Sequence, residues 1–375
     1  MKFIPVCEPL LDGNEKKYLD KCIETGWISS EGPFVQEFEE KFSRFVNRKF
    51  GIAVSNGTAA LQVAVDALEL PRGSEVIMPA FTIISCAAAI VRAGLKPVLV
   101  DADPFTWNMD TKQIKLRITK RTKAIMVVHI YGLPNDMDPI LALAKENRLK
   151  IIEDFAELIG QTYKDKPCGS FGDISITSFY PNKHIATGEG GMVLTDDSHL
   201  AARCRSLRNL CFIPEKRFFH KKLGYNFRLT NLQAALGLAQ LERINSFVKK
   251  KRWIGKMYNE KLAGFTHINL PLSQTTYAQN IYWVFGIVLS DSVKLSVKQV
   301  MERLAKEGIG TRPFFWSMHE QPVFNKMGLF KDEKYPVAER LARRGFYIPN
   351  GLTITNNQID KVVTAVKTVL EDQHA

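Results

Sequence analysis

Short apolar runs alternate with amphipathic stretches through the first part of the chain. The apolar run Phe50–Val54 is followed by apolar residues at i, i+3, i+4 and i+7 from Leu61, which predicts a strand and then an amphipathic helix. Further runs of strand length occur at Glu75–Met78, Pro97–Val100, Ala124–Val128, Lys150–Glu153 and Ile174–Ser178. Helical patterns lie between them, for example at Ser85–Ala93 and Asp138–Asn147. Apolar strands that alternate with helices predict a mainly parallel sheet covered on both faces.

The pattern changes after a long helix that we expect from Leu229 to about Lys251. Beyond it, one strand and two helices are predicted, at Tyr282–Leu289, Val297–Glu307 and Ile359–Glu371. We therefore expect an N-terminal segment with a large domain over residues 1–245 and a small α+β domain over residues 246–375. The first thirty residues are expected to pack beside the small domain.

Composition and cysteine usage narrow the class of protein. The chain has 375 residues, 45% of them hydrophobic, which is enough for a large core and argues against extensive disorder. It begins without an apolar secretory segment and contains no run of eighteen apolar residues, so we expect a cytoplasmic protein with no membrane partner. The six cysteines are scattered without a C-x-x-C pair, which predicts reduced thiols and no metal site.

The formal net charge of +12 leaves two interpretations open. The basic residues cluster at Lys115–Lys123, Arg203–Arg208, Lys216–Lys222 and Lys249–Arg252. No nucleic-acid-reading module accompanies them, so we expect no nucleic-acid partner. Solvated helix faces account for most of these residues, and the surplus also fits a field that attracts a diphosphate-bearing substrate.

The turn Ser55-Asn56-Gly57-Thr58 joins the first predicted strand to the first predicted helix. Glycine lets the backbone approach a ligand closely, and a helix N-terminus offers free N–H groups and the positive end of a dipole. Gly57 and Thr58 are therefore candidates for holding a phosphate. Simple capping of the helix by Ser55 or Asn56 is the alternative.

Two other segments carry candidate chemistry. The strand at Lys150–Glu153 leads into Asp154, at the strand end where ligands bind in open α/β sheets. Asp154 would pair with a cationic group of a cofactor, or cap the segment that follows. Lys183 lies in an irregular turn after the strand Ile174–Ser178, and a buried lysine with a lowered pKa is a Schiff-base nucleophile. His184 beside it is a candidate proton carrier, with packing as the alternative.

In this order, the segments resemble the DegT/StrS group of sugar aminotransferases. The resemblance covers nearly the whole chain and is strongest in VSNGTAAL, IIEDFAE, SFYPNKHIATGEGGM and GYNFRLTNLQAALGLAQL. It implies an α/β, fold-type-I aminotransferase: a large domain with a mainly parallel sheet flanked by helices, plus a smaller α+β C-terminal domain. It also implies pyridoxal 5'-phosphate as cofactor, with pyridoxamine 5'-phosphate as its amino-loaded form.

The resemblance assigns roles near the cofactor ring. Lys183 would bind the cofactor as a Schiff base and later shuttle protons, and Asp154 would keep the pyridine nitrogen protonated. Glu157 would lie on the side of the cofactor's hydroxyl group. The family usually stacks an aromatic residue on the ring, but the matching position here is Ile83. Phe81 is a candidate substitute, although its parity along the chain argues against it.

The resemblance also assigns the phosphate site to Gly57, Thr58 and Ser178. Asn226 would reach that phosphate from the neighbouring subunit, which implies a homodimer with shared active sites. One branch of the family dehydrates its substrate and has His in place of the Schiff-base lysine. Because Lys183 is present, we expect amino transfer.

Three segments resemble the branch that moves the amino group of L-glutamate to C4 of GDP-4-keto-6-deoxy-D-mannose, giving GDP-perosamine and 2-oxoglutarate. These are KFIPVCEPLLDGNEK, TGWISSEGPFVQEFEEKF and GTRPFFWSMHEQPVF. The expected substrate-binding residues are Trp27, Ser29, His184, Arg312 and His319. The Arg312 guanidinium suits phosphate oxygens. A surface ion pair for Arg312, and packing for His319 and Trp27, stay open as alternatives.

Two rival functions follow from the same residues. The first keeps the chemistry and changes the substrate to a UDP- or dTDP-linked keto sugar. The second is a regulator that kept the fold and lost activity. The intact Asp154, Ser178 and Lys183 argue against the regulator.

Overall fold

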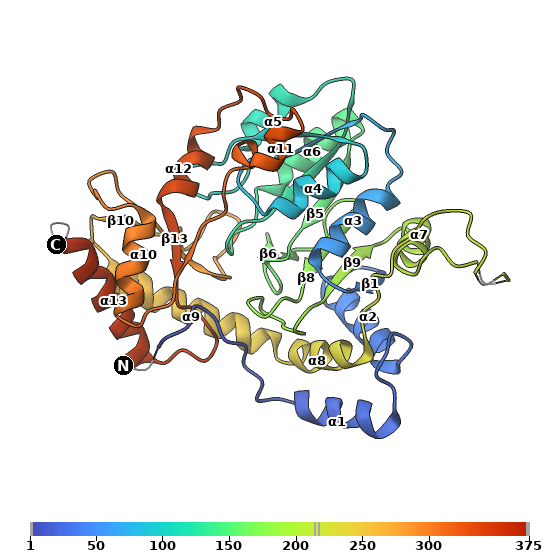
Figure 1. Ribbon diagram of the computed structural model, residues 1–375, viewed down its shortest axis with the longest axis horizontal. Coiled ribbons are helices and arrows are strands. Elements are labelled where there is room, and N and C mark those ends of the chain that lie inside the picture. The colour runs from blue at the N-terminus through green and yellow to red at the C-terminus, as the bar shows by residue number, and fades with distance from the viewer. Residues whose placement is uncertain (1–2, 214, 217, 373–375) are drawn as a thin grey trace.

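The computed structural model describes residues 3–213, 215–216 and 218–372. A seven-stranded sheet in the order β1-β9-β8-β5-β4-β2-β3 forms its centre (Figure 1). The strands are β1 (Phe50–Val54), β2 (Glu75–Pro79), β3 (Lys96–Val100), β4 (Thr122–Val128), β5 (Lys150–Asp154), β8 (Ile174–Ser178) and β9 (Gly191–Thr195). In this sheet β9 runs antiparallel to both of its neighbours, β1 and β8, and the pairs from β8 to β3 are parallel. The predicted mainly parallel sheet is confirmed.

Helices cover both faces of this sheet because alternate residues of each strand point to opposite sides. In β2, Val76 and Met78 belong to one core, and Ile77 belongs to the other. The first core includes α3 (Gly57–Ala67), α4 (Ile84–Arg92) and α7 (Ser198–Arg208). The second includes α2 (Pro33–Phe45), α5 (Thr111–Arg117), α6 (Met137–Asn147) and α8 (Asn231–Leu241).

A second sheet of four antiparallel strands lies in the C-terminal part, in the order β10-β11-β13-β12. Its strands are β10 (Ile268–Asn269), β11 (Phe285–Leu289), β12 (Arg312–Pro313) and β13 (Gly345–Ile348). A third core joins it to α9 (Ile244–Leu262), α10 (Val297–Lys306) and α13 (Asn356–Glu371). The short elements are the hairpin β6 (Thr162–Tyr163) and β7 (Lys166–Pro167), the 3-10 helix η1 (Met318–Glu320), α11 (Pro322–Lys326) and α12 (Pro336–Arg344).

The prediction of a single long helix from Leu229 to about Lys251 is wrong, because the chain forms α8 and α9 with a break between them. At the break, Arg243 has φ −111° and ψ 3°, and its N–H donates to the carbonyl of Gln240 instead of continuing the α-helical pattern. The Arg243 guanidinium forms an ion pair with Asp12 of the N-terminal segment. Figure 1 shows α9 running on from α8 toward the small sheet.

The N-terminal segment contacts both parts of the molecule. Its first described residues join the small sheet region, where Ile4 bridges Ile309 and the Val6 carbonyl accepts from the N–H of Asn350. Helix α1 (Glu15–Thr25) instead lies along α8, where the Cys22 thiol donates to the carbonyl of Asn231. Because α9 runs across residue 246, the division at residues 245 and 246 stays a prediction. Among the described helices, none combines the length and the apolar character that crossing a membrane requires.

Candidate active site

A cavity of about 990 Å³ opens at the carboxyl ends of the parallel strands. Val128, Asp154 and Ser178, which are the last residues of β4, β5 and β8, line it. The C-terminal part contributes Trp283 and Tyr347. Six predicted site residues line this cavity together, namely Gly57, Thr58, Asp154, Glu157, Ser178 and Lys183.

One end of the cavity has the chemistry of a phosphate site. Gly57 begins α3, and a Cβ atom on it would lie 2.7 Å from the Cβ of Ser178, so only glycine allows this close approach. The Thr58 and Ser85 hydroxyl oxygens lie 2.9 Å apart where α3 and α4 begin. The Asn56 side chain accepts from the N–H of Ala59 at 2.8 Å, so capping occurs as well. The N-termini of α3 and α4 therefore converge here with the hydroxyl groups of Thr58, Ser85 and Ser178.

Asp154 is a buried carboxylate at the end of β5, and its side chain faces the cavity floor. One of its oxygens accepts from the N–H of Ala156 at 3.0 Å, and the other lies 3.6 Å from the Cys86 sulfur, which donates to it. Burial raises the pKa of Asp154. A protonated ring nitrogen against this carboxylate would compensate the cost of burying its charge.

Lys183 reaches the cavity from the turn after β8. Its Nζ lies 3.9 Å from Oε1 of Glu157 and 3.6 Å from the ring centroid of Trp283. Burial lowers the pKa of Lys183, and the Glu157 and Asp154 carboxyls oppose this shift. A lysine whose neutral form is favoured in this way is a competent nucleophile and base.

Glu157 lies between Lys183 and the loop that follows β4. Its Oε2 accepts from the N–H of Tyr131 at 2.7 Å. Burial raises the pKa of Glu157 to about 8, although the nearby Lys183 acts in the opposite direction. The two groups are thus close enough for each to shift the pKa of the other.

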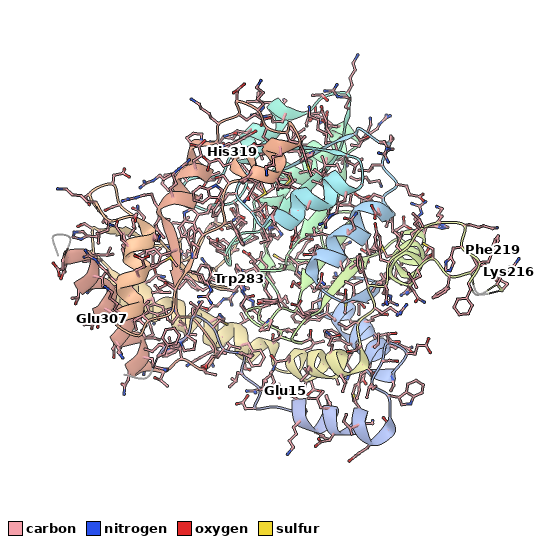
Figure 2. All side chains as sticks on the ribbon, in the orientation of Figure 1. Glu15, Lys216, Phe219, Trp283, Glu307 and His319 are labelled. Carbon is pink, nitrogen blue, oxygen red and sulfur yellow. The ribbon has the colours of Figure 1, made fainter. Side chains whose placement is uncertain are left out.

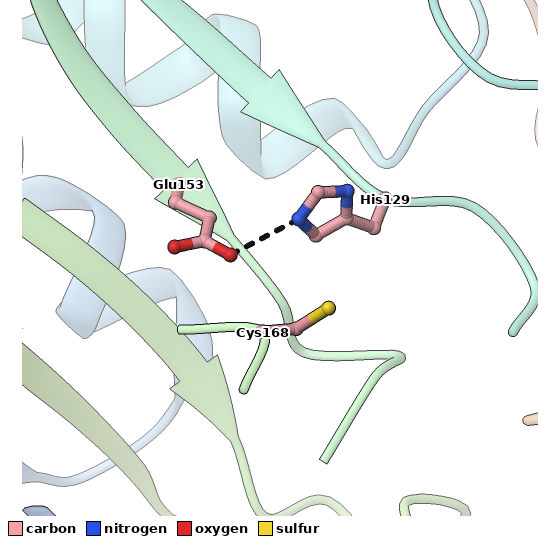
Figure 3. Close-up of side chains that lie close together, drawn as sticks. All are labelled: His129, Glu153 and Cys168. Carbon is pink, nitrogen blue, oxygen red and sulfur yellow. Dashed lines mark hydrogen bonds and ion pairs between the residues drawn. The ribbon is translucent and has the colours of Figure 1, made fainter. Parts of the chain in front are cut away.

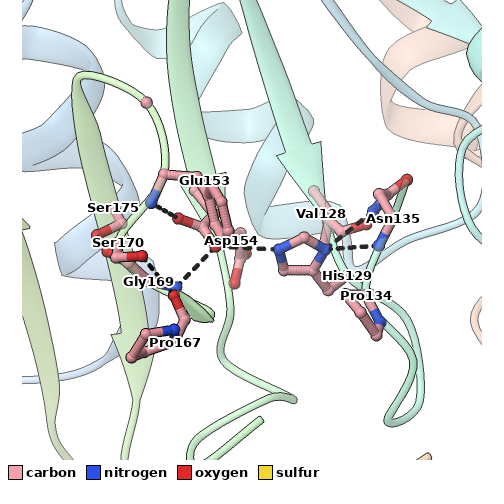
Figure 4. Close-up of polar contacts among 12 residues, drawn as sticks. Val128, His129, Pro134, Asn135, Glu153, Asp154, Pro167, Gly169, Ser170 and Ser175 are labelled. Atoms are coloured by element: carbon pink, nitrogen blue, oxygen red, sulfur yellow. Dashed lines mark hydrogen bonds and ion pairs between the residues drawn. The ribbon is translucent and has the colours of Figure 1, made fainter. Parts of the chain in front are cut away.

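A second buried polar cluster supports the strand ends behind Asp154 (Figures 3 and 4). His129, Glu153 and Cys168 place potential metal ligands close together, and all three are buried. However, Glu153 already accepts from the N–H groups of Gly169 at 2.7 Å and Phe171 at 2.8 Å.

The hydrogen bonds also assign the ring of His129. Its Nδ1 accepts from the N–H of Asn135 at 3.0 Å, so its Nε2 donates to Glu153 at 3.1 Å. Both ring nitrogens of His129 and both carboxylate oxygens of Glu153 therefore have hydrogen-bond partners. The hydrogen bonds of His129 and Glu153 together fix the loops that follow β4 and β5.

The position expected to stack on a cofactor ring is aliphatic in the structure as well. Ile83 precedes α4, is 41% exposed and lines the cavity. Phe81 is fully buried, with its ring 5.8 Å from that of Tyr131 in an edge-to-face contact, so it does not replace the aromatic residue.

The donor set fits pyridoxal phosphate. The phosphate would bind at the start of α3, the ring nitrogen would face Asp154, and the aldehyde carbon would face Lys183. The fit follows from the clash that any side chain at Gly57 would cause and from the burial of Asp154 at 3% exposure.

The other predicted site residues do not line this cavity. Trp27 and Ser29 are exposed between α1 and α2, where their carbonyl groups accept from Asn231. His184 is fully buried, its ring nitrogens lack hydrogen-bond partners, and burial lowers its pKa to about 3. Packing describes its position better than proton transfer. Asn226 is exposed at the base of the loop between α7 and α8.

Arg312 and His319 lie in different surroundings. Arg312 is exposed on β12, opposite the cavity residue Tyr347 of β13, and so lies at the cavity rim. His319 is 7% exposed, lies 3.1 Å from Oε1 of Glu339 and packs its ring against Tyr335. Figure 2 shows His319 well away from Trp283 at the cavity.

Several lining residues were not predicted. Phe315, Trp283 and Tyr347 come from the C-terminal part, a hundred or more residues after Lys183 in the chain. No short motif surrounds Trp283 or Tyr347, whereas Phe315 lies in the segment GTRPFFWSMHEQPVF. An available signal was the pair of aromatic residues, Tyr282 and Trp283, at the start of the predicted strand Tyr282–Leu289.

Comparison with known proteins agrees with this geometry. The model of the DegT/DnrJ/EryC1/StrS aminotransferase family matches residues 9–367. GDP-perosamine synthase from Escherichia coli O157:H7 is 39% identical over 373 residues, which cover 100% of both chains. The synthase of the same name from Caulobacter vibrioides is 40% identical over 368 residues and 98% of both chains. The one from Vibrio cholerae is 37% identical over 364 residues, or 97% of this chain and 98% of that one.

Solved structures show the same fold. An aminotransferase from Psychrobacter cryohalolentis is 28% identical, with a TM-score of 0.91 and coverage of 100% of both chains. The aminotransferase TlmJ from Streptoalloteichus hindustanus is 26% identical, with a TM-score of 0.91 and coverage of 99% of this chain and 100% of that one. The chain therefore belongs to the DegT/DnrJ/EryC1/StrS family of pyridoxal-phosphate-dependent aminotransferases.

Proposed function

We propose that this aminotransferase moves the amino group of L-glutamate to C4 of GDP-4-keto-6-deoxy-D-mannose, giving GDP-perosamine and 2-oxoglutarate. The observation that carries the chemistry is the meeting of Lys183, Asp154 and the Gly57–Ser178 contact in one cavity. The choice of sugar is supported by relatives named GDP-perosamine synthase that are 37–40% identical over nearly the whole chain. The basic surplus of the chain suits a substrate that carries a diphosphate.

The site residues divide the work among binding, charge control and proton transfer. Pyridoxal phosphate, when bound, supplies a conjugated ring that carries the amino group between the two substrates. Gly57, Thr58 and Ser178 would hold the phosphate at the start of α3. Asp154 would accept a hydrogen bond from the ring nitrogen and keep it protonated. Lys183 would carry a proton between the substrate carbon and the cofactor carbon in each half of the reaction.

Glu157 assists this proton transfer from beside Lys183. With a pKa raised to about 8, its carboxyl keeps a proton near neutral pH. It would lie beside the cofactor's hydroxyl group and share a hydrogen bond with it.

The same proposal includes a homodimer whose two sites are shared. Asn226 is exposed and does not line the cavity of its own chain, whereas Tyr225 and Phe227 on either side of it do. Neighbouring side chains in an extended segment point in opposite directions, so Asn226 faces outward. The loop before it extends away from the molecule beyond α7 (Figure 1), and Figure 2 labels Lys216 and Phe219 in this loop. This geometry suits a contact with a partner's phosphate site.

Trp27, Ser29 and Arg312 are the surface residues that we propose for sugar-nucleotide binding. Arg312 lies at the rim of its own cavity. Trp27 is 48% exposed and would act from a partner subunit.

We also propose a cytoplasmic location for the enzyme. The six free cysteines fit this location, where disulfides are rare.

A panel of keto sugars tests the substrate. Enzyme loaded with amino groups from glutamate is given GDP-4-keto-6-deoxy-D-mannose, and separately UDP- and dTDP-linked keto-deoxy sugars, under single-turnover conditions. Amino-sugar formation, followed by mass spectrometry, should be fastest with the GDP sugar. A faster reaction with a UDP or dTDP sugar would move the assignment to that nucleotide, and no glutamate-dependent change at all would favour the regulator.

A further inference from the structure

The amine of the catalytic lysine lies on the face of an indole ring. The Nζ atom of Lys183 is 3.6 Å from the ring centroid of Trp283, which is closer than its 3.9 Å distance to Oε1 of Glu157. An ammonium over an indole face is attracted by the negative charge of the π system, and the attraction increases when water is excluded. Trp283 is 3% exposed, so this contact is buried.

The indole is fixed from two directions. Its N–H donates to the carbonyl of Asn182, the residue before the lysine, at 2.8 Å. The backbone carbonyl of Trp283 accepts from Nζ of Lys251 at 3.0 Å, and Lys251 also donates to the carbonyl of Asn350 at 2.7 Å. Lys251 is 1% exposed and belongs to α9, so the anchor of the indole lies in the core beneath the small sheet.

Trp283 therefore connects the two parts of the enzyme at the reacting amine. It stands two residues before β11 of the small sheet, yet it joins the hydrophobic core of the large sheet. Figure 2 shows it between the small-sheet region and the large sheet. Its face is the surface of the C-terminal part that meets Lys183.

Several titratable groups act on the Lys183 amine besides the indole. They come from the N-terminal segment, α4, the end of β5 and the turn that follows it, and the lysine's own turn: Cys7, Cys86, Asp154, Glu157 and His184. Burial, the largest effect, favours the neutral amine. Glu157 and Asp154 favour the ammonium. The indole face adds a stabilisation of the ammonium that does not itself titrate.

We propose that Trp283 is a positioning residue for the proton shuttle, whose indole face holds the Lys183 ammonium whenever that amine is not bonded to the cofactor. In this position the amine can return to the cofactor carbon without first leaving for solvent. The face also keeps the ammonium form accessible in a buried site, which a base needs after it has accepted a proton.

The inference is tested on the full-length protein without cofactor. The apoprotein is labelled with traces of isotopic acetic anhydride across the neutral to alkaline range, and the labelling rate of each lysine peptide is measured by mass spectrometry. Trp283→Leu should lower the titration midpoint of Lys183 by about one pKa unit, with faster labelling at neutral pH. Trp283→Phe keeps an aromatic face and should give a smaller shift in the same direction.

Trp253 provides a matched control. Its ring also carries a lysine ammonium, with Nζ of Lys250 at 3.8 Å from its centroid, but it lies on α9 and does not line the cavity. Trp253→Leu should lower the midpoint of Lys250 and leave that of Lys183 unchanged. An unchanged or raised Lys183 midpoint in Trp283→Leu would overturn the inference. If that variant does not fold, an unchanged midpoint in Trp283→Phe does so instead.

This inference rests on Lys183 as the reactive lysine and not on the identity of the sugar. The result of the labelling experiment is therefore independent of whether the proposed sugar substrate is correct. In the loaded enzyme, Trp283→Leu should lower kcat with little change in the KM for glutamate. This split separates a role at the amine from a general loss of substrate binding.

Discussion

Gly57 lies so close to Ser178 that a Cβ atom on it would be 2.7 Å from the Cβ of Ser178. The contact joins the first residue of α3 to the last residue of β8. It brings a helix N-terminus against a strand end and leaves no room for a side chain between them. The proposed phosphate site would therefore be a product of backbone packing, with the hydroxyl groups arranged around it.

Gly57→Ala should weaken the binding of pyridoxal phosphate by at least about tenfold, because either α3 or the end of β8 must move. The Kd is measured by the fluorescence change when apoprotein is titrated with cofactor. Gly13→Ala is the control, since its new Cβ would meet side chains and no backbone, with Arg243 at 2.9 Å and the Glu15 carboxylate at 3.3 Å. Equal cofactor affinities in the two variants would contradict a phosphate site at Gly57.

Asp154→Asn should slow the glutamate half-reaction by at least about 100-fold, because the amide keeps the shape and loses the charge that holds the ring nitrogen protonated. Stopped-flow absorbance after mixing with glutamate gives the rate. The melting temperature of the apoprotein should fall little, because burial already disfavours the charged form of Asp154 and raises the pKa of its carboxyl. A near-normal rate would mean that another group pairs with the ring.

Glu157 should make the apoprotein less stable as the pH rises. Its pKa is raised to about 8 in the fold from its ordinary value of 4.5, so the folded state binds more protons than the unfolded state between these values. Stability therefore falls over that window, and Glu157→Gln should remove this part of the slope. Melting temperatures at about pH 5 and about pH 8 measure it.

The exposed cavity residue Glu189 supplies the control for this pH dependence. Glu189→Gln should keep the slope of the native protein. If Glu157→Gln also keeps it, then Glu157 is not the group that gains a proton on folding.

The fold could be predicted closely where each strand carries its own apolar run. The bounds expected for β1 and β8 match the structure, and those for β2 to β5 differ by one or two residues. The break between α8 and α9 could not be predicted in this way. Apolar residues continue across it at Leu241, Ile244 and Phe247, and neither Gly nor Pro marks it. The residue at the break, Arg243, forms an ion pair with Asp12, which is distant in the sequence.

The same limit applies to the site. Local motifs identify Gly57, Asp154 and Lys183, because each of these residues lies at the end of a strand, after one, or at the start of a helix. Trp283 and Tyr347 reach the cavity only after the small sheet has folded against the large one. Nothing in their own segments indicates which face of that sheet they serve.

Asn226 should act across the subunit boundary, and a mixture of two inactive variants tests this. Lys183→Ala removes the amine, and Asn226→Asp sets a negative charge against the partner's phosphate. When the two are mixed and allowed to exchange subunits, half of the dimers contain one chain of each kind. In such a dimer, the site with an intact Lys183 receives an intact Asn226 from its partner.

About a quarter of native activity should therefore return, since half of the dimers are mixed and half of their sites are whole. Formation of mixed dimers is verified with differently tagged chains, and each variant measured alone supplies the baseline. The exposed position of Asn226 between the cavity residues Tyr225 and Phe227 is the geometric reason for this expectation. If both residues served the same chain's site, every mixed dimer would hold two broken sites. Mixed dimers without recovered activity would then exclude the shared site.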